Sequence, residues 1–267
     1  MEARPCSSSS AEHRCSRVPA MTHDRPLAGR SVVVTRAAEQ AGPFVTSLRN
    51  LGAAVVEVPV IRIAAPDDGG ASLLSSVRDL ASYDWVVLTS PNAAERFLRA
   101  VDESAIGHAD LKIACVGPGT ASVVRDGGRS VALVADRAVG EGLVESFPLG
   151  SGRVLLPCAA VARSVVPDGL RARGWTVDEV VAYRTEPIPA DPVMRSAVGE
   201  ADAIAFTSSS TVRAFVSSLG TDALPPIVVS IGPETTATLI EHGVRPFRTA
   251  DPHTLDGLLR ALVESLK

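Results

Sequence analysis

Four short segments rich in Gly, Ser and Thr recur along the sequence, each between an apolar run typical of a strand and a pattern typical of a helix. Free backbone N–H groups at the start of a helix can bind an anion, and the helix dipole favours negative charge there. The segments therefore predict an anion-binding site, although ordinary helix caps and turns have the same composition. The segments are 89–92, 117–120, 207–210 and 232–236, and Gly117 and Gly232 at the start of two of them are candidate binding residues.

Two single residues could do chemistry beside such a site. Arg36 follows the apolar run 32–34 at the exit of an expected strand, where its guanidinium could bind a carboxylate through two hydrogen bonds. Tyr183 lies in a segment that could connect two parts of the chain. Its phenol, with an ordinary pKa of about 10, would stay protonated at neutral pH and could act as a general acid. A tyrosine of the core or of a linker is the alternative interpretation.

Other chemistries have few candidates. No G-x-G-x-x-G follows an expected strand and no G-x-x-x-x-G-K-[ST] occurs, which argues against NAD and ATP. The four cysteines form no C-x-x-C and have no His at ligand spacing, so we expect no structural zinc site. Among the histidines only His253 stands near an expected strand exit, where a solvated surface residue is the simpler interpretation. A net charge of −4 and a 4% aromatic content argue against nucleic acid as a partner.

The chain of 267 residues has the length of two ordinary domains. It contains no run of 18 apolar residues, and residues 1–24 lack the apolar stretch of a signal peptide, so we expect neither a membrane span nor export. Cys115 and Cys158 stand in apolar runs typical of buried thiols in a reducing compartment, which predicts a cytoplasmic protein. Residues 1–24 are expected to form a disordered tail, and Met21 is an alternative start to Met1.

An internal repeat organises the chain. Four blocks recur in the same order about 120 residues apart, and each copy alternates short Val, Ile and Leu runs with helical patterns. This alternation is typical of βαβ units with helices on both faces of a parallel sheet. We therefore predict an α/β protein of two small doubly wound domains, each with four or five strands. The paired blocks begin at Gly29 and Gly152, at Asp84 and Asp202, at Val116 and Ile231, and at Asp136 and Asp251.

The repeat leaves the domain boundary open. A plain tandem duplication would divide the chain near Gly150. Two further matching segments, 57–62 and 179–184, each precede Pro-rich sequence and could instead be paired connections between domains. Periodicity does not choose between these two arrangements.

The order of these motifs resembles the uroporphyrinogen-III synthase family over about residues 27–263. The matching pieces are 33–36, 48–61, 83–93, 116–121, 181–185, 206–208 and 231–235. The resemblance implies two α/β lobes joined by a two-stranded crossing, with the first strand–helix unit placed in the C-terminal lobe. On this pattern lobe 1 is residues 25–59 plus 186–267, lobe 2 is 64–181, and the crossings are 60–63 and 182–185.

The resemblance also implies a reaction of tetrapyrrole and heme biosynthesis. The family converts linear hydroxymethylbilane, which carries eight carboxylates, to uroporphyrinogen III with loss of water and inversion of the last pyrrole ring, without cofactor or metal. Loss of the hydroxyl needs a proton donor, and Tyr183 matches the family tyrosine proposed for this role. Attack from the substituted carbon of the last ring would give a spiro intermediate, which fragments and recloses. The residues matching family positions that line the cleft are Arg36, Ser90, Thr120, Ser208 and Thr235.

A hypothesis from another class is a non-catalytic module of two lobes that closes on a small anionic metabolite. It stays open because the family has few indispensable side chains. Separately, this sequence departs from the family pattern at Glu234, which places a carboxylate beside an expected anion site and bears on how that loop meets the substrate. As partners we expect only the small-molecule substrate hydroxymethylbilane, without nucleic acid or membrane, and we expect a monomer.

Overall fold

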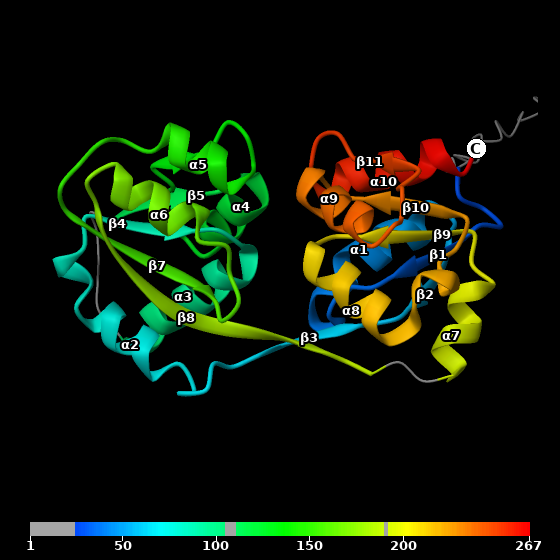
Figure 1. Cartoon of the computed structure of the whole chain (residues 1–267), viewed down its shortest axis with the longest axis horizontal. Helices are drawn as coiled ribbons and strands as arrows, with labels where there is room; N and C mark the ends of the chain where they lie inside the picture. The colour runs from blue at the N-terminus through cyan, green and yellow to red at the C-terminus, as the bar shows by residue number, and fades with distance from the viewer. Residues whose placement is uncertain (1–24, 105–110, 190–191) are drawn as a thin grey trace, which may run out of the picture.

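The computed structural model describes residues 25–104, 111–189 and 192–267, in which β-strands alternate with α-helices (Figure 1). The expected disordered tail 1–24 and the alternative start at Met21 lie outside the described residues. The strands form two separate sheets, and helices cover both faces of each sheet. The predicted α/β class with two mainly parallel sheets is confirmed, although the second sheet has six strands where four or five were expected, because one antiparallel strand is added to it.

Five parallel strands form the first sheet: β1 (Ser31–Val34), β2 (Ala54–Glu57), β9 (Ala203–Phe206), β10 (Ile227–Ser230) and β11 (Arg248–Thr249). Their order is β11-β10-β9-β1-β2. Two helices, α1 (Ala38–Asn50) and α10 (Leu255–Ser265), pack on one face, and α7 (Pro192–Gly199), α8 (Ser209–Leu219) and α9 (Pro233–Glu241) pack on the other. Burial on both faces explains why β1 is almost wholly Val. We call this sheet and its helices lobe 1.

The second sheet has six strands: β3 (Ile61–Ala64), β4 (Trp85–Leu88), β5 (Lys112–Cys115), β6 (Leu133–Val134), β7 (Arg153–Ala159) and β8 (Thr176–Pro187). Their order is β3-β8-β7-β4-β5-β6, and all pairs are parallel except that of β3 with β8. Helices α2 (Ala71–Arg78), α3 (Pro91–Ser104) and α4 (Pro118–Asp126) cover one face, and α5 (Gly140–Ser146) and α6 (Val165–Ala172) cover the other. We call this sheet and its helices lobe 2.

The two lobes repeat one topology with different starting points. In lobe 1 the order β2-β1-β9-β10-β11 follows the chain as 2-1-3-4-5, the order of flavodoxin-like sheets. In lobe 2 the same spatial order is β8-β7-β4-β5-β6, so its first two strands come last in the chain. The two lobes are therefore related by a circular permutation of their strands. Lobe 1 combines strands from both ends of the described chain. The exact residue limits of the lobes stay a prediction.

A two-stranded antiparallel ribbon connects the lobes (Figure 1). In this ribbon β3 pairs with the last four residues of β8, from Ile61 opposite Pro187 to Ala64 opposite Arg184. Glu186 accepts ion-pair contacts from Arg62 at 2.7 Å and from Arg184 at 3.0 Å. Because β8 continues from this ribbon into the parallel sheet of lobe 2, a change of angle between the lobes must bend β8 or its neighbourhood.

One repeated aspartate has a structural role in each lobe. Asp202 precedes β9 and accepts hydrogen bonds from the backbone N–H and the hydroxyl of Ser31, both at 2.7 Å. Asp84, its partner in the repeat, precedes β4 and accepts one from the backbone N–H of Arg153 at 2.9 Å. In both lobes the carboxylate thus satisfies the first N–H group of the neighbouring strand.

We expect Asp202→Ala to lower the free energy of unfolding by about 1 kcal/mol at neutral pH, since a partly exposed charged acceptor is lost. The bonds from Ser31 hold the pKa of Asp202 below its ordinary value. The aspartate therefore stabilises the fold above its unfolded pKa of about 4, and this contribution disappears as pH falls through the lower folded pKa. Urea denaturation from neutral to acidic pH would measure the difference. A difference between the two proteins that does not shrink in acid would contradict this role.

Candidate active site

Tyr183 and Ser90 meet at the carboxyl end of the lobe 2 sheet. Tyr183 lies on β8 opposite Ala159 of β7, and only 7% of its surface is exposed. Its phenol oxygen is 3.0 Å from the hydroxyl oxygen of Ser90, which in turn accepts a hydrogen bond from the N–H of Ala93 in the first turn of α3. Two residues 93 positions apart in the chain are thereby joined.

The phenol of Tyr183 is held in its protonated form. Burial raises its pKa above the ordinary value, and hydrogen bonds with Ser90 and Asn92 counteract only part of this increase. A raised pKa leaves the O–H intact at neutral pH, which is the state that a general acid requires. Much of the ring packs in the core beneath α2 and α3, so Tyr183 is a core residue whose hydroxyl reaches the carboxyl ends of the strands.

Arg36 faces lobe 2 from the bend after β1. Its side chain is half-buried, and burial lowers the pKa of its guanidinium while the charge of Glu95 on α3 partly offsets this. Its Nε atom is buried and has no hydrogen-bond partner among the residues that the structure describes. A buried donor without a partner is uncommon, and an incoming carboxylate would satisfy it.

Gly117 and Gly232 begin the equivalent helices α4 and α9, each followed directly by proline. Both have extended backbones, with φ of −172° and −177°, so their conformation does not require glycine. Close packing disfavours a side chain at both positions. A Cβ on Gly117 would lie 2.8 Å from the Cβ of Ala138, and one on Gly232 would lie 3.3 Å from the ring of His253. The absence of a side chain at each position therefore makes room for Ala138 and for His253 beside the two helix starts.

The hydroxyl side chains at the helix starts are buried or hydrogen-bonded within the protein. Thr120 and Thr235 are only 3% exposed, so a ligand would meet the backbone around them rather than their side chains. Ser208 caps α8, since its hydroxyl accepts a hydrogen bond from the N–H of Thr211 at 3.3 Å and lies 2.9 Å from that of Ser210. Ordinary capping is therefore present, as the alternative interpretation of the sequence expected.

Two polar contacts cross from one lobe to the other. Gln40 of α1 donates a short hydrogen bond from its Nε2 to Oδ1 of Asn92 in α3. Arg163, in the loop after β7, forms an ion pair with Glu234 of α9 at 2.7 Å. Gln40, Asn92 and Arg163 were not among the residues selected from the sequence. Arg163 could have been found, because it follows a strand exit in one lobe as Arg36 does in the other.

A cavity of about 260 Å³ lies beside the second of these contacts. Glu234 contributes to it from lobe 1, and its other lining residues come from lobe 2, from strands of its sheet and from the starts of α5 and α6 with the loops before them. None of the eight residues selected from the sequence lines it, although Thr89, Val116 and Glu234 are neighbours in the chain of three of them. Cys158 lines it as well, and burial, followed by the charge of Glu179, raises the pKa of its thiol.

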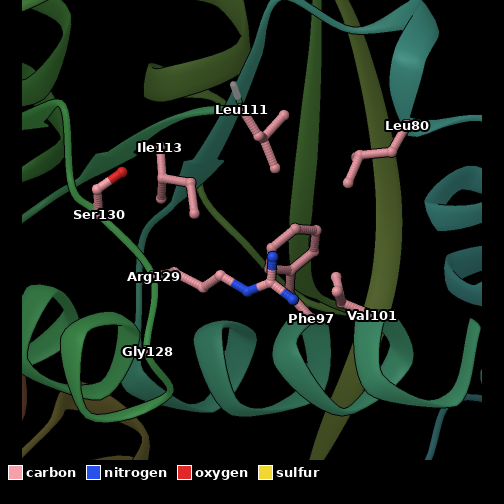
Figure 2. Close-up of a pocket in the computed structure, with 8 residues that line it drawn as sticks. All are labelled: Leu80, Phe97, Val101, Leu111, Ile113, Gly128, Arg129 and Ser130. Carbon is pink, nitrogen blue, oxygen red and sulfur yellow. The ribbon is translucent and has the colours of Figure 1, made fainter. Parts of the chain in front are cut away.

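A second cavity of about 330 Å³ lies at the other end of the lobe 2 strands, away from Tyr183 and Ser90 (Figure 2). Arg129 extends into it among apolar side chains. Ligands of doubly wound sheets bind at the carboxyl ends of the strands, whereas this cavity lies at the amino ends of β4, β5 and β6. It is therefore not part of the candidate site. Its lining residues are Leu80, Phe97, Val101, Leu111, Ile113, Gly128, Arg129 and Ser130.

In the described part of the chain, His, Cys, Asp and Glu residues form no cluster of three or more that could hold a metal ion. Across residues 25–104, 111–189 and 192–267, no helix has the length and apolar character needed to cross a membrane.

The family model described as uroporphyrinogen-III synthase HemD matches residues 42–260. The chain belongs to the uroporphyrinogen-III synthase family. It is 34% identical to the uroporphyrinogen-III synthase of Synechococcus elongatus over 255 residues, which cover 90% of this chain and 96% of that relative. It is 28% identical to the chloroplastic uroporphyrinogen-III synthase of Oryza sativa, over 88% of this chain and 80% of the relative. The expected family and enzyme class, a cyclising hydro-lyase of tetrapyrrole biosynthesis, are confirmed.

Solved structures of uroporphyrinogen III synthases share the fold. A mutant form of the Thermus thermophilus enzyme has a TM-score of 0.64 at 20% identity, over 89% of this chain and 98% of that one. The Helicobacter pylori enzyme has a TM-score of 0.58 at 18% identity, over 89% of this chain and all of the other. At these identities the likeness supports the two-lobed α/β architecture of this synthase and not the roles of single residues.

Proposed function

We propose that this synthase closes hydroxymethylbilane to uroporphyrinogen III and that Tyr183 donates the proton for departure of the terminal hydroxyl. The observation that carries this assignment is the phenol of Tyr183, buried, protonated and held 3.0 Å from Ser90 at the carboxyl edge of the sheet. Protonation turns the hydroxyl into water as it leaves, and the substrate becomes an azafulvenium cation, whose pyrrole N–H proton can return to the tyrosinate to give the azafulvene. Attack by the substituted carbon of the last ring then gives the spiro intermediate, whose fragmentation and reclosure invert that ring.

Helix starts on both lobes would bind the substrate carboxylates. α3 and α4 begin at the carboxyl edge of the lobe 2 sheet, and α8 and α9 begin at the equivalent edge in lobe 1. Gly117 and Gly232 stand directly before α4 and α9, while Ser208 and Ser90 stand at the other two starts. Arg36 supplies a guanidinium whose buried Nε atom lacks a partner among the described residues. These donors suit a polycarboxylate without a strongly basic surface.

Positioning would supply much of the rate and the choice of isomer. The free bilane is flexible, and holding its two ends in one geometry converts a rarely visited conformation into the bound one. Contacts from two lobes can fix both ends of a linear substrate at once. The expectations of a cofactor-independent monomer in the cytoplasm, without nucleic acid or membrane as partner, stay predictions.

The purified protein, given freshly prepared hydroxymethylbilane, is expected to form uroporphyrinogen III in excess over the symmetric isomer I. After oxidation of the products to porphyrins, chromatographic separation of the two isomers measures the ratio, with an enzyme-free sample as the control. A product composed only of isomer I, at the rate of that control, would reject the synthase activity and favour the non-catalytic module that binds an anionic metabolite.

A further inference from the structure

Arg163 is held between two carboxylates at the border of the lobes. It forms an ion pair with Glu141 of its own lobe and a second one with Glu234 of the other lobe, at 2.7 Å. Both glutamates lie in the first turn of a helix, α5 and α9 respectively, where a negative charge is favourable. The position of Glu234 is therefore one that would suit a carboxylate from any source.

The surroundings of Arg163 favour ligand binding over a purely structural role. Its side chain is 54% exposed and lines the 260 Å³ cavity at the carboxyl edge of lobe 2. It follows β7 as Arg36 follows β1, so the two arginines leave the corresponding strands of the repeated topology. Glu234 is the cavity's lining residue from lobe 1, and its carboxylate covers the guanidinium from that side.

We propose that Arg163 binds a carboxylate of the substrate and that Glu234 is an internal competitor for the same guanidinium. Without substrate, the carboxylate of Glu234 forms the ion pair with Arg163. A carboxylate of the substrate then replaces Glu234 as the partner of Arg163. This inference rests on the proposed function, since it assigns one contact of the same polycarboxylate substrate. It also gives Glu234, the glutamate beside an expected anion site, a role: its carboxylate would lower the affinity for the substrate.

Competition predicts opposite effects for the two partners of one ion pair. Arg163→Ala removes the binding group and is expected to raise KM about five- to tenfold with little change in kcat. Glu234→Gln removes the competitor and is expected to lower KM about two- to fivefold, the range of an exposed ion pair. Arg163→Lys keeps the charge without the planar fork and should give an intermediate KM.

A double variant separates competition from general charge repulsion, because Glu234→Gln also removes a negative charge near an anionic substrate. If Glu234 acts through Arg163, Glu234→Gln should give no further gain in the Arg163→Ala background. If it acts only by repulsion, the gain should persist there. Arg248→Ala is the matched control: its ion pair with Glu264, at 3.2 Å, is similarly exposed and lies on the opposite end of lobe 1.

Two readouts keep failure of this inference distinct from failure of the proposed function. KM and kcat for hydroxymethylbilane measure catalysis, and the fluorescence anisotropy of uroporphyrin III, a stable octacarboxylate, measures binding without turnover. Opposite shifts for Arg163→Ala and Glu234→Gln in both readouts, lost in the double variant, support the inference. Shifts in the same direction would make the pair a structural contact between the lobes and overturn it, as would no shift or a gain that persists in the double variant. A wild-type protein without isomer III activity would reject the function instead.

Discussion

Replacing Tyr183 by Phe is expected to lower kcat by about 100-fold, the lower range for loss of a general acid. The substitution removes only the phenol oxygen, so the ring still packs in the lobe 2 core. The hydrogen bond with Ser90 is lost, which should cost about 1 kcal/mol of folding free energy. Single-turnover kinetics with hydroxymethylbilane would measure the rate, and thermal denaturation would measure the stability.

The chain offers a matched control, because Tyr83 is its only other tyrosine. Tyr83 lies two residues before β4, at the amino ends of the strands of the same sheet, and its ring lies 4.6 Å from the guanidinium of Arg153. Tyr83→Phe should keep kcat within about twofold, because this tyrosine lies at the far edge from the proposed site. Equal kcat for Tyr183→Phe and the wild type would remove Tyr183 as the proton donor.

Replacing Phe147 by Ala is expected to lower the stability of lobe 2 by about 3–5 kcal/mol, the usual range for a large buried ring. Phe147 is fully buried after α5. Its ring centre is 4.9 Å from that of Trp85 and 5.6 Å from that of Trp175. Truncation would leave a cavity between two rigid indoles, which cannot close over it without moving the sheet.

Both tryptophans of the chain belong to this cluster, so their fluorescence reports on lobe 2. In urea the fluorescence transition of Phe147→Ala should move to lower concentration by more than that of Phe147→Leu, which leaves a smaller cavity. The circular dichroism of both lobes should separate into two steps if lobe 1 unfolds on its own. An unchanged fluorescence midpoint would show that the aromatic cluster contributes little to the stability of lobe 2.

Local patterns were enough to predict the class of fold. A run such as Val32 to Val34 predicts a buried strand, because β-branched residues favour an extended backbone. A continuous apolar run also fits a parallel sheet, whose two faces are both covered. The repeated aspartates at 84 and 202 were visible as well, and each satisfies the neighbouring strand. The order of the motifs led to the family, and the family model and relatives confirmed it.

The candidate site was predicted less completely. Tyr183 and Ser90 were both selected from the sequence. Their contact was not predicted, because it depends on how β8 and the end of β4, 93 positions apart in the chain, are placed in one sheet. Arg163 was missed because its partner Glu234 comes from the other lobe, and no local spacing relates the two. The burial of Thr120 and Thr235 was not foreseeable either, since a hydroxyl that follows Gly-Pro has the same sequence signature whether it faces a ligand or the core.

By itself, therefore, the sequence determined the kinds of elements, their repetition and the family to which the chain belongs. These properties depend on backbone sterics and on the spacing of apolar side chains within a few residues, which a linear pattern records. Only the tertiary structure decided that β1 lies between β2 and β9, and that lobe 2 is a circular permutation of lobe 1. Strand order depends on which apolar faces bury one another over more than 100 residues of chain, and that choice is made by packing in three dimensions.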